Sequence, residues 1–217
     1  MRLAEDAQKD LEARSQAREA FQRIGSHIES HGTRHMKKTS DGRFVLSLKK
    51  LNMGDVFVGF VDSGSRGGFK SLPQGWYIEI PVLLNPGDPS FLDTRWESVR
   101  RTFVHEFTHL LDALRFDIDK AKLRRYDHDL EAYFNSPHEV NAYFQEAVSE
   151  VEDMLESDDL QLVLKHGLKA GDFRSFSRQF LETFLDEGFR KHMREDVKRR
   201  ILKRLFGFYE HRIVPLL

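Results

Sequence analysis

Apolar residues recur every three to four positions near the start of the chain and are separated by charged ones. The apolar positions are Leu3, Ala7, Leu11, Ala17, Phe21, Ile24 and Ile28. This spacing predicts a helix over residues 3–31 with a narrow apolar face. Gly25 and Ser26 could interrupt it, because Ser26 and Glu29 have capping-box spacing. The first half is polar enough to be an extension or a docking arm, and residues 1–32 are therefore expected to form an N-terminal helical arm.

The pattern then changes to short segments rich in β-branched and aromatic residues, separated by turn residues. These segments are 44–48, 56–61 and 76–84. They predict three strands of a small, mainly antiparallel sheet. The glycine-rich link 62–68 matches neither a P-loop nor a dinucleotide-binding pattern, so we expect a hairpin loop there. Pro81 indicates that the third strand lies at a sheet edge or is bulged.

The rest of the chain has a helical pattern. Thr94 and Glu97 have capping-box spacing, and apolar residues then recur at helical intervals as far as Leu114. Further helices are expected over 137–156, 173–187 and 190–209. The prediction is an α+β fold with a mostly helical C-terminal half, in which residues 33–217 form one domain.

Composition narrows the chemistry that this fold could support. The 217-residue chain has no cysteine, which excludes disulfides and thiolate ligands, so a bound metal would need histidine and carboxylate. The formal net charge of −1 provides no general attraction for nucleic acid or membranes. No apolar run is long enough to cross a bilayer, and the N-terminus lacks the apolar stretch of a secretory signal. We therefore expect a cytoplasmic protein with no membrane partner.

The segment His105-Glu106-Phe107-Thr108-His109 contains H-E-x-x-H within the periodic helix. His105 and His109 would lie one turn apart and about 40° apart around the axis, so both can reach one ion. Glu106 would lie at the edge of that sector, where its carboxylate can take a proton from a metal-activated water. The ordinary alternative is two histidines with local partners on a core helix. The motif predicts Zn²⁺ held by His105 and His109, with Glu106 as general base.

The residues around the motif resemble the signature of the zincin metallopeptidases. Thr102 lies three positions before the first histidine, the inner positions are uncharged, and Leu110 and Leu111 follow the second histidine. The resemblance implies a small sheet packed on the active-site helix, with an edge strand along which a polypeptide substrate binds. We expect residues 76–84 to be that edge strand, unless a loop merely covers it.

A catalytic zinc needs a third protein ligand, and Glu139 is the favoured candidate. Its place near the start of the helix 137–156 resembles the gluzincin layout, and more closely the looser variant of ImmA/IrrE-like and phage-type peptidases. Tyr143 stands where thermolysin-like enzymes have an aspartate, which argues against kinship with those enzymes. Glu139 also has capping-box spacing from Ser136, which would explain it without a metal. Further candidate ligands are His128, Glu131, His138 and Glu146.

Two residues are candidates for supporting roles at the metal. Asp112 lies on the histidine side of its helix, where it could orient a ligand imidazole or pair with Arg115. Tyr143 is a candidate donor to the oxyanion that forms during hydrolysis, as are Tyr133 and His128.

Two other functions compete with zinc-dependent peptide hydrolysis. Residues 190–204 contain eight Lys or Arg against two acidic residues, which would suit a nucleic-acid partner. Ile201, Leu202 and Leu205 interrupt this segment at core spacing, which favours a solvated helix face paired with acidic residues of 150–159, and makes nucleic acid an unlikely partner. The second competitor is a non-catalytic structural or adaptor protein with a zinc site, which would not need Glu106.

Overall fold

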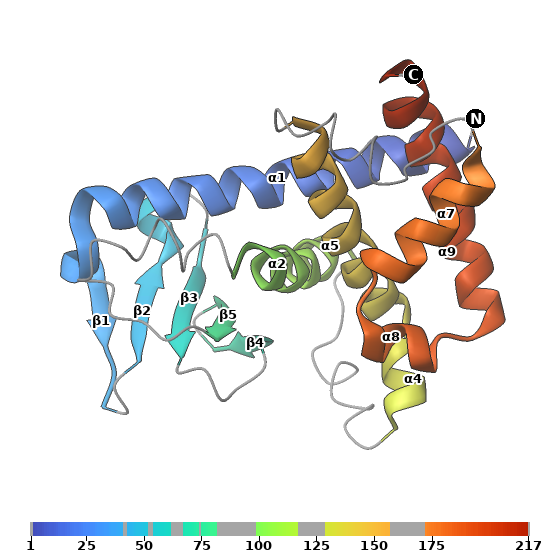
Figure 1. Cartoon of the computed structure of the whole chain (residues 1–217). Coiled ribbons are helices and arrows are strands. Elements are labelled where there is room, and N and C mark those ends of the chain that lie inside the picture. The colour runs from blue at the N-terminus through green and yellow to red at the C-terminus, as the bar shows by residue number, and fades with distance from the viewer. Residues whose placement is uncertain are drawn as a thin grey trace. The chain divides into compact units, whose positions relative to one another are not determined.

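The computed structural model describes residues 2–40, 43–51, 54–61, 67–73, 75–81, 99–116, 129–156 and 172–216 (Figure 1). The chain divides into two compact units: residues 1–14 with 121–217, here the helical unit, and residues 15–120, here the sheet unit. Helix α1 (Arg2–His31) contributes to both. The predicted helix over 3–31 is therefore confirmed, and it continues without a break through Gly25 and Ser26.

The sheet unit contains one mixed sheet of five strands in the described chain. The strands are β1 (Met36–Lys38), β2 (Phe44–Ser47), β3 (Val56–Val61), β4 (Gly68–Leu72) and β5 (Gly75–Pro81), in the order β1-β2-β3-β5-β4. The pairs β1–β2, β2–β3 and β4–β5 are antiparallel, whereas β3 and β5 are parallel. Short 3-10 turns, η1 (Gly32–His35) and η2 (Leu48–Leu51), precede β1 and follow β2. The α+β class is confirmed, with two strands that the sequence pattern did not predict.

The prediction that residues 76–84 form an edge strand is wrong for the part that the structure describes. Strand β5 lies between β3 and β4: it pairs with β3 along residues 76–81 and with β4 along residues 75–79. Pro81 is the last residue of β5, where its missing N–H is tolerated. Residues 82–84 lie outside the described part of the chain. The prediction of a hairpin loop after residue 61 is also wrong. In the sequence β4 follows β3, but in the sheet β4 pairs with β5 and not with β3, so the hairpin is formed by β4 and β5.

Gly75 is required where β5 begins beside β3. Its φ is +143°, and an added Cβ would lie 2.0 Å from the backbone oxygen of Asp55. The same oxygen accepts a hydrogen bond from the backbone N–H of Trp76 at 2.9 Å. Any side chain at position 75 would disturb the start of the parallel β3–β5 pair.

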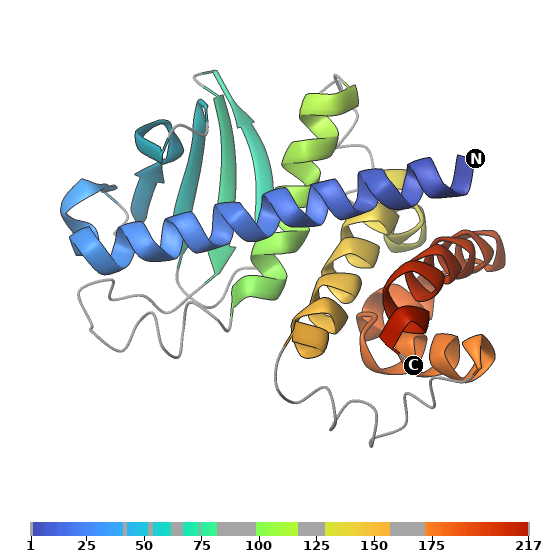
Figure 2. The same ribbon diagram turned by 90° about the horizontal axis from the view of Figure 1, so that it is seen from above.

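One face of the sheet carries the core of the sheet unit. Alternate strand residues point into it: Leu46, Val56, Val58, Phe60, Ile78 and Ile80. Residues of α1 and of α2 (Arg100–Phe116) complete the cluster, and the rings of Phe21 and Phe103 lie 5.5 Å apart. Figure 2 shows the second half of α1 crossing the strands and α2 beside β5. The two helices therefore bury their apolar sides together with one face of the sheet.

The helical unit consists of the start of α1 and a series of short and medium helices. They are α4 (Leu130–Phe134), α5 (Pro137–Glu156), α7 (Phe173–Thr183), α8 (Glu187–His192) and α9 (Glu195–Phe208), followed by a π turn, η6 (Tyr209–Ile213), and a 3-10 turn, η7 (Val214–Leu216). The helix predicted over 137–156 is confirmed at both ends. The helices predicted over 173–187 and 190–209 have the expected outer ends, but their inner boundaries are wrong. The carboxylate of Asp186 accepts a hydrogen bond from the backbone N–H of Phe189 and starts α8 as a separate helix.

Polar contacts attach the beginning of α1 to the helical unit. The guanidinium of Arg14 donates to both carboxylate oxygens of Glu152 on α5, at 2.9 and 3.0 Å, and to Gln145 at 2.9 Å. The side chains of Arg14 and Glu152 are each only 5% exposed. Arg204 of α9 also donates to both oxygens of Asp10, at 3.1 and 2.8 Å. These paired charges hold residues 10–14 against α5 and α9 without a broad apolar face on the helix.

The basic segment 190–204 forms parts of α8 and α9. Lys191 pairs with Glu187 at 2.7 Å, and Lys198 and Arg200 lie within 4.0 Å of Glu195 and Asp196. Among the acidic residues of α5, Glu152 lies 3.9 Å from Arg212, which is outside this segment. Several of the basic charges are therefore balanced within their own helices. Among the helices described, none combines the length and apolar character needed to cross a membrane.

Candidate metal centre

Helix α2 brings His105 and His109 together as the motif predicts. Their rings are 4.9 Å apart between centroids and nearly perpendicular, at 82°. A nitrogen of one lies within 4.8 Å of a nitrogen of the other. Both residues are 7% exposed. The predicted cap at Thr94 and Glu97 lies outside the described residues, so the start of α2 is described only from Arg100.

The apolar residues of α2 determine which side of the helix carries the histidines. Phe103, Val104, Phe107 and Leu110 are buried in the core of the sheet unit. The hydroxyl of Thr108 donates to the backbone oxygen of Val104 at 2.8 Å, so its polar group is satisfied within the helix. Anchoring by these side chains leaves His105 and His109 on a common side, one turn apart.

An aromatic pair from the sheet lies beside the second histidine. Phe69 of β4 stacks on Trp76 of β5, with ring centroids 5.1 Å apart and planes at 15°. The ring of Phe69 lies 6.3 Å from that of His109. Low polarity next to an imidazole strengthens its electrostatic interaction with a bound cation, because fewer waters compete.

Glu106 lies against the start of β4. A Cβ added at Gly67 would come within 2.9 Å of the Glu106 carboxylate oxygen Oε1 and 2.6 Å of the Thr102 methyl group. Glu106 is 6% exposed. The backbone at Gly67 therefore has room for this carboxylate only because residue 67 has no side chain. Sequence reasoning missed this position, although the pair Gly67-Gly68 was visible in a segment assigned to a loop.

Asp112 is also buried on α2. It is 9% exposed, and at about 20° around the helix axis from His105 it shares the histidine side. Arg115, the alternative partner considered from sequence, is exposed. Burial of a carboxylate is costly unless hydrogen bonds or opposite charge compensate it.

The remaining predicted residues belong to the helical unit. Glu139, in the first turn of α5, is 4% exposed, and its carboxylate lies 4.0 Å from the Nε2 of His138. Glu146 is 8% exposed, further along α5. The ring of Tyr143 stacks on Phe189 at 4.7 Å and 19°. Glu139 belongs to the helical unit, whereas the two histidines belong to the sheet unit.

Another sequence candidate, Glu131, is less suited to a buried site. Glu131 on α4 is exposed, and its backbone oxygen accepts a hydrogen bond from Asn135 at 2.7 Å. His128 lies outside the described residues.

The side chains on α2 fit a zinc ion by their chemistry. Imidazole nitrogens bind zinc at about 2.0–2.1 Å, so two ligand nitrogens on one ion are at most ~4 Å apart. The nitrogens of His105 and His109, within 4.8 Å of each other, need little more than ring rotation to reach that range. Both rings are buried, which limits competition from solvent.

No protein-family model matches the sequence, and neither the curated proteins nor the solved structures give a significant match. The resemblance to zincins therefore depends on α2 and its flanking residues.

Proposed function

We propose that this protein is a zinc-dependent metallopeptidase in which His105 and His109 hold the metal and Glu106 is the general base. The observation that carries the proposal is a buried histidine pair one turn apart on α2, with the acidic residue that follows the first histidine also buried. A site that only held a metal would not need Glu106.

Each side chain has a distinct task in this proposal. When bound, zinc would polarise the scissile carbonyl and increase the acidity of a water molecule. The Glu106 carboxylate would accept the proton and pass it to the leaving amine. Asp112 would orient an imidazole, and the Tyr143 hydroxyl is the candidate donor to the developing oxyanion.

In this proposal the substrate binds along β4 and not along residues 76–84, which were the edge strand expected from the sequence. It is the outer strand of the described sheet on the side of β5, and its beginning lies against Glu106. An extended peptide could pair with the outer edge of β4 by β-augmentation. Its scissile bond would then pass the Glu106 carboxylate.

We propose Glu139 as the third ligand. Its support is the resemblance of its sequence position to the gluzincin layout and its burial in the first turn of α5. A metal ion shared by Glu139 and the two histidines would compensate a buried carboxylate and leave a fourth position open.

Metal analysis tests the histidine ligands directly. The His105→Ala variant should bind about one zinc equivalent less per chain than the unchanged protein, because the remaining imidazole and the Glu139 carboxylate are too few ligands to hold zinc tightly. His211→Ala, which removes an exposed histidine of the helical unit, is the control and should keep the full complement. Equal zinc content in all three proteins would remove the basis of the proposal.

The third ligand can be tested with two buried glutamates of α5. Glu139→Gln should weaken zinc binding by at least about tenfold, comparable with losses seen at disturbed zinc sites. Glu146→Gln is the matched control, since Glu146 is also buried on α5 and the change also removes one charge. Zinc titration by calorimetry measures both. A loss confined to Glu146→Gln would transfer the ligand role to that residue.

Substitution of Gly67 tests the position of Glu106. Gly67→Ala should reduce kcat by roughly 10²-fold, because the new methyl group displaces Glu106 or Thr102. Gly68→Ala is the matched control, since its added Cβ would have no neighbour nearer than 3.7 Å. Turnover of a fluorescently labelled unfolded protein, with zinc present, is the measurement. Similar rates for the two variants would show that Gly67 does not position the carboxylate.

A further inference from the structure

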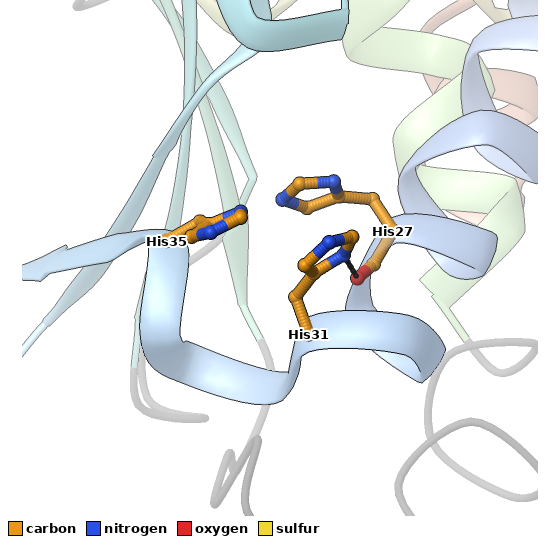
Figure 3. Close-up of side chains that lie close together, drawn as sticks. All are labelled: His27, His31 and His35. Atoms are coloured by element: carbon orange, nitrogen blue, oxygen red, sulfur yellow. Dashed lines mark hydrogen bonds between the residues drawn. The ribbon is translucent and has the colours of Figure 1, made fainter.

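A second group of histidines lies at the end of α1 in the sheet unit. Figure 3 shows His27, His31 and His35 with their rings gathered together. His27 and His31 are one turn apart on α1, and His35 ends the 3-10 turn η1. Gly32 begins that turn with a φ of 56°, a left-handed conformation that lets the chain bend after the helix. The bend brings His35 back toward the two helical histidines.

The three rings are close enough for their nitrogens to share an ion. Their centroids are separated by 4.5 Å for His27–His31, 4.4 Å for His31–His35 and 5.2 Å for His27–His35. One nitrogen from each ring lies within 4.8 Å of the other two. Three protonated imidazoles at this spacing would repel one another, whereas three neutral ones offer lone pairs to a cation.

The hydrogen bond of His31 prepares its ring for metal binding. Its Nδ1 lies 3.1 Å from the backbone oxygen of His27. A carbonyl oxygen only accepts, so Nδ1 carries the proton, and in the neutral ring Nε2 keeps its lone pair. Metal-binding histidines commonly donate their second nitrogen to a backbone carbonyl in this way, which fixes both tautomer and orientation.

The surroundings admit an ion without enclosing it. His27 and His31 are half-buried and His35 is exposed, so water can occupy the remaining coordination positions and the rings can rotate. The last turn of α1 presents the negative end of its dipole, which favours a cation. Arg34 opposes this with a positive charge, although its Nε is engaged with the backbone oxygen of His31 at 3.1 Å. Lys37 and Lys38 of β1 are also nearby in sequence and add positive charge. Only a metal ion that bonds strongly to imidazole nitrogen would overcome this repulsion.

We propose that His27, His31 and His35 form a second binding site for a divalent transition-metal ion. Three imidazoles with no carboxylate among them suit Cu²⁺, Ni²⁺ or Zn²⁺ and do not suit Mg²⁺ or Ca²⁺, which require oxygen ligands. Because Met36, the first residue of β1, follows His35 directly, the ion would fasten the end of α1 to the start of the sheet. This site does not depend on the proposed peptidase activity.

The test uses the full chain with the α2 histidines removed. In the His105→Ala/His109→Ala background, Cu²⁺ binding should persist, and its electron paramagnetic resonance spectrum should show nitrogen coupling from several imidazoles. Adding His31→Asn or His35→Asn should weaken Cu²⁺ and Zn²⁺ binding by at least about tenfold, equivalent to ~1.4 kcal/mol. His211→Asn in the same background is the control and should bind as the background does. Loss of binding in the background itself, or equal affinity in all variants, would overturn the proposal.

Melting temperatures with and without metal distinguish a metal site from a histidine cluster that only binds protons. His35 is exposed on a 3-10 turn, so His35→Asn should fold normally, and circular dichroism in the presence of a chelator checks this. Addition of Zn²⁺ should raise the melting temperature of the background protein but not that of its His35→Asn form. If instead Zn²⁺ has no effect, and acid alone destabilises the background relative to His35→Asn, the cluster responds to protons and the metal proposal is wrong.

Discussion

Glu106→Gln should keep zinc bound and the fold intact while reducing peptide hydrolysis by roughly 10²–10⁴-fold. Glutamine has nearly the same shape as glutamate, so it fits beside Gly67, where the Glu106 carboxylate now lies. It cannot accept a proton at neutral pH, which removes the base without removing the metal ligands. The measurements are kcat on a labelled unfolded protein and zinc content of the same preparation.

A surface substitution provides the comparison for this variant. Glu131→Gln, at an exposed position on α4, changes charge by the same amount and should leave both activity and zinc content unaltered. Full activity in Glu106→Gln would disprove the assigned role of Glu106. Loss of zinc together with activity would instead make Glu106 a contributor to the metal site.

Glu152→Ala should destabilise the helical unit by about 3–5 kcal/mol. The substitution leaves the Arg14 guanidinium buried after losing two hydrogen bonds, at 2.9 and 3.0 Å, to Glu152. Arg212, 3.9 Å from the same carboxylate, loses a partner as well. Denaturant unfolding followed by circular dichroism should show the change, and hydrogen exchange should show faster opening of α5 and residues 8–14 of α1.

Two controls distinguish the effect of leaving a buried charge without its partner from the effect of removing any charged side chain. Replacing both partners, Arg14→Met with Glu152→Met, should cost much less than Glu152→Ala, because no buried charge is left without compensation. Glu19→Ala removes an exposed i,i+4 pair of α1, whose closest atoms are 3.4 Å apart, and should change stability by only about 0.5 kcal/mol. Equal effects of Glu152→Ala and Glu19→Ala would mean that burial of the Arg14–Glu152 pair contributes nothing.

Elements that depend on neighbours in the chain were predictable. The helix over 137–156 follows from local periodicity and from Pro137 at its first position, and α5 has those bounds. The course of α1 was also predictable, although the potential cap at Ser26 did not interrupt it, since packing of Ile24 and Ile28 in the core outweighs a local alternative.

Elements that depend on partners distant in the sequence could not be predicted. Strand β1, Met36-Lys37-Lys38, carries no apolar alternation and exists because β2 pairs with it. Strand β4 was hidden in a glycine-rich stretch, and it changes the topology by displacing β5 from the edge of the sheet. The histidine cluster at the end of α1 has i, i+4 and i+8 spacing in the sequence, but Gly32 breaks the helix between its last two members, so only the bend shows that the rings meet.

The sequence by itself determined the helix of His105, Glu106 and His109 and the one-turn spacing of the two histidines, because i,i+4 geometry is a property of the helix alone. Only the tertiary structure decided what surrounds that helix. It set Gly67 against Glu106, Phe69 beside His109 and β4 at the sheet edge. These relations join residues far apart in the chain, and their free energy comes from packing and strand pairing that no local pattern encodes.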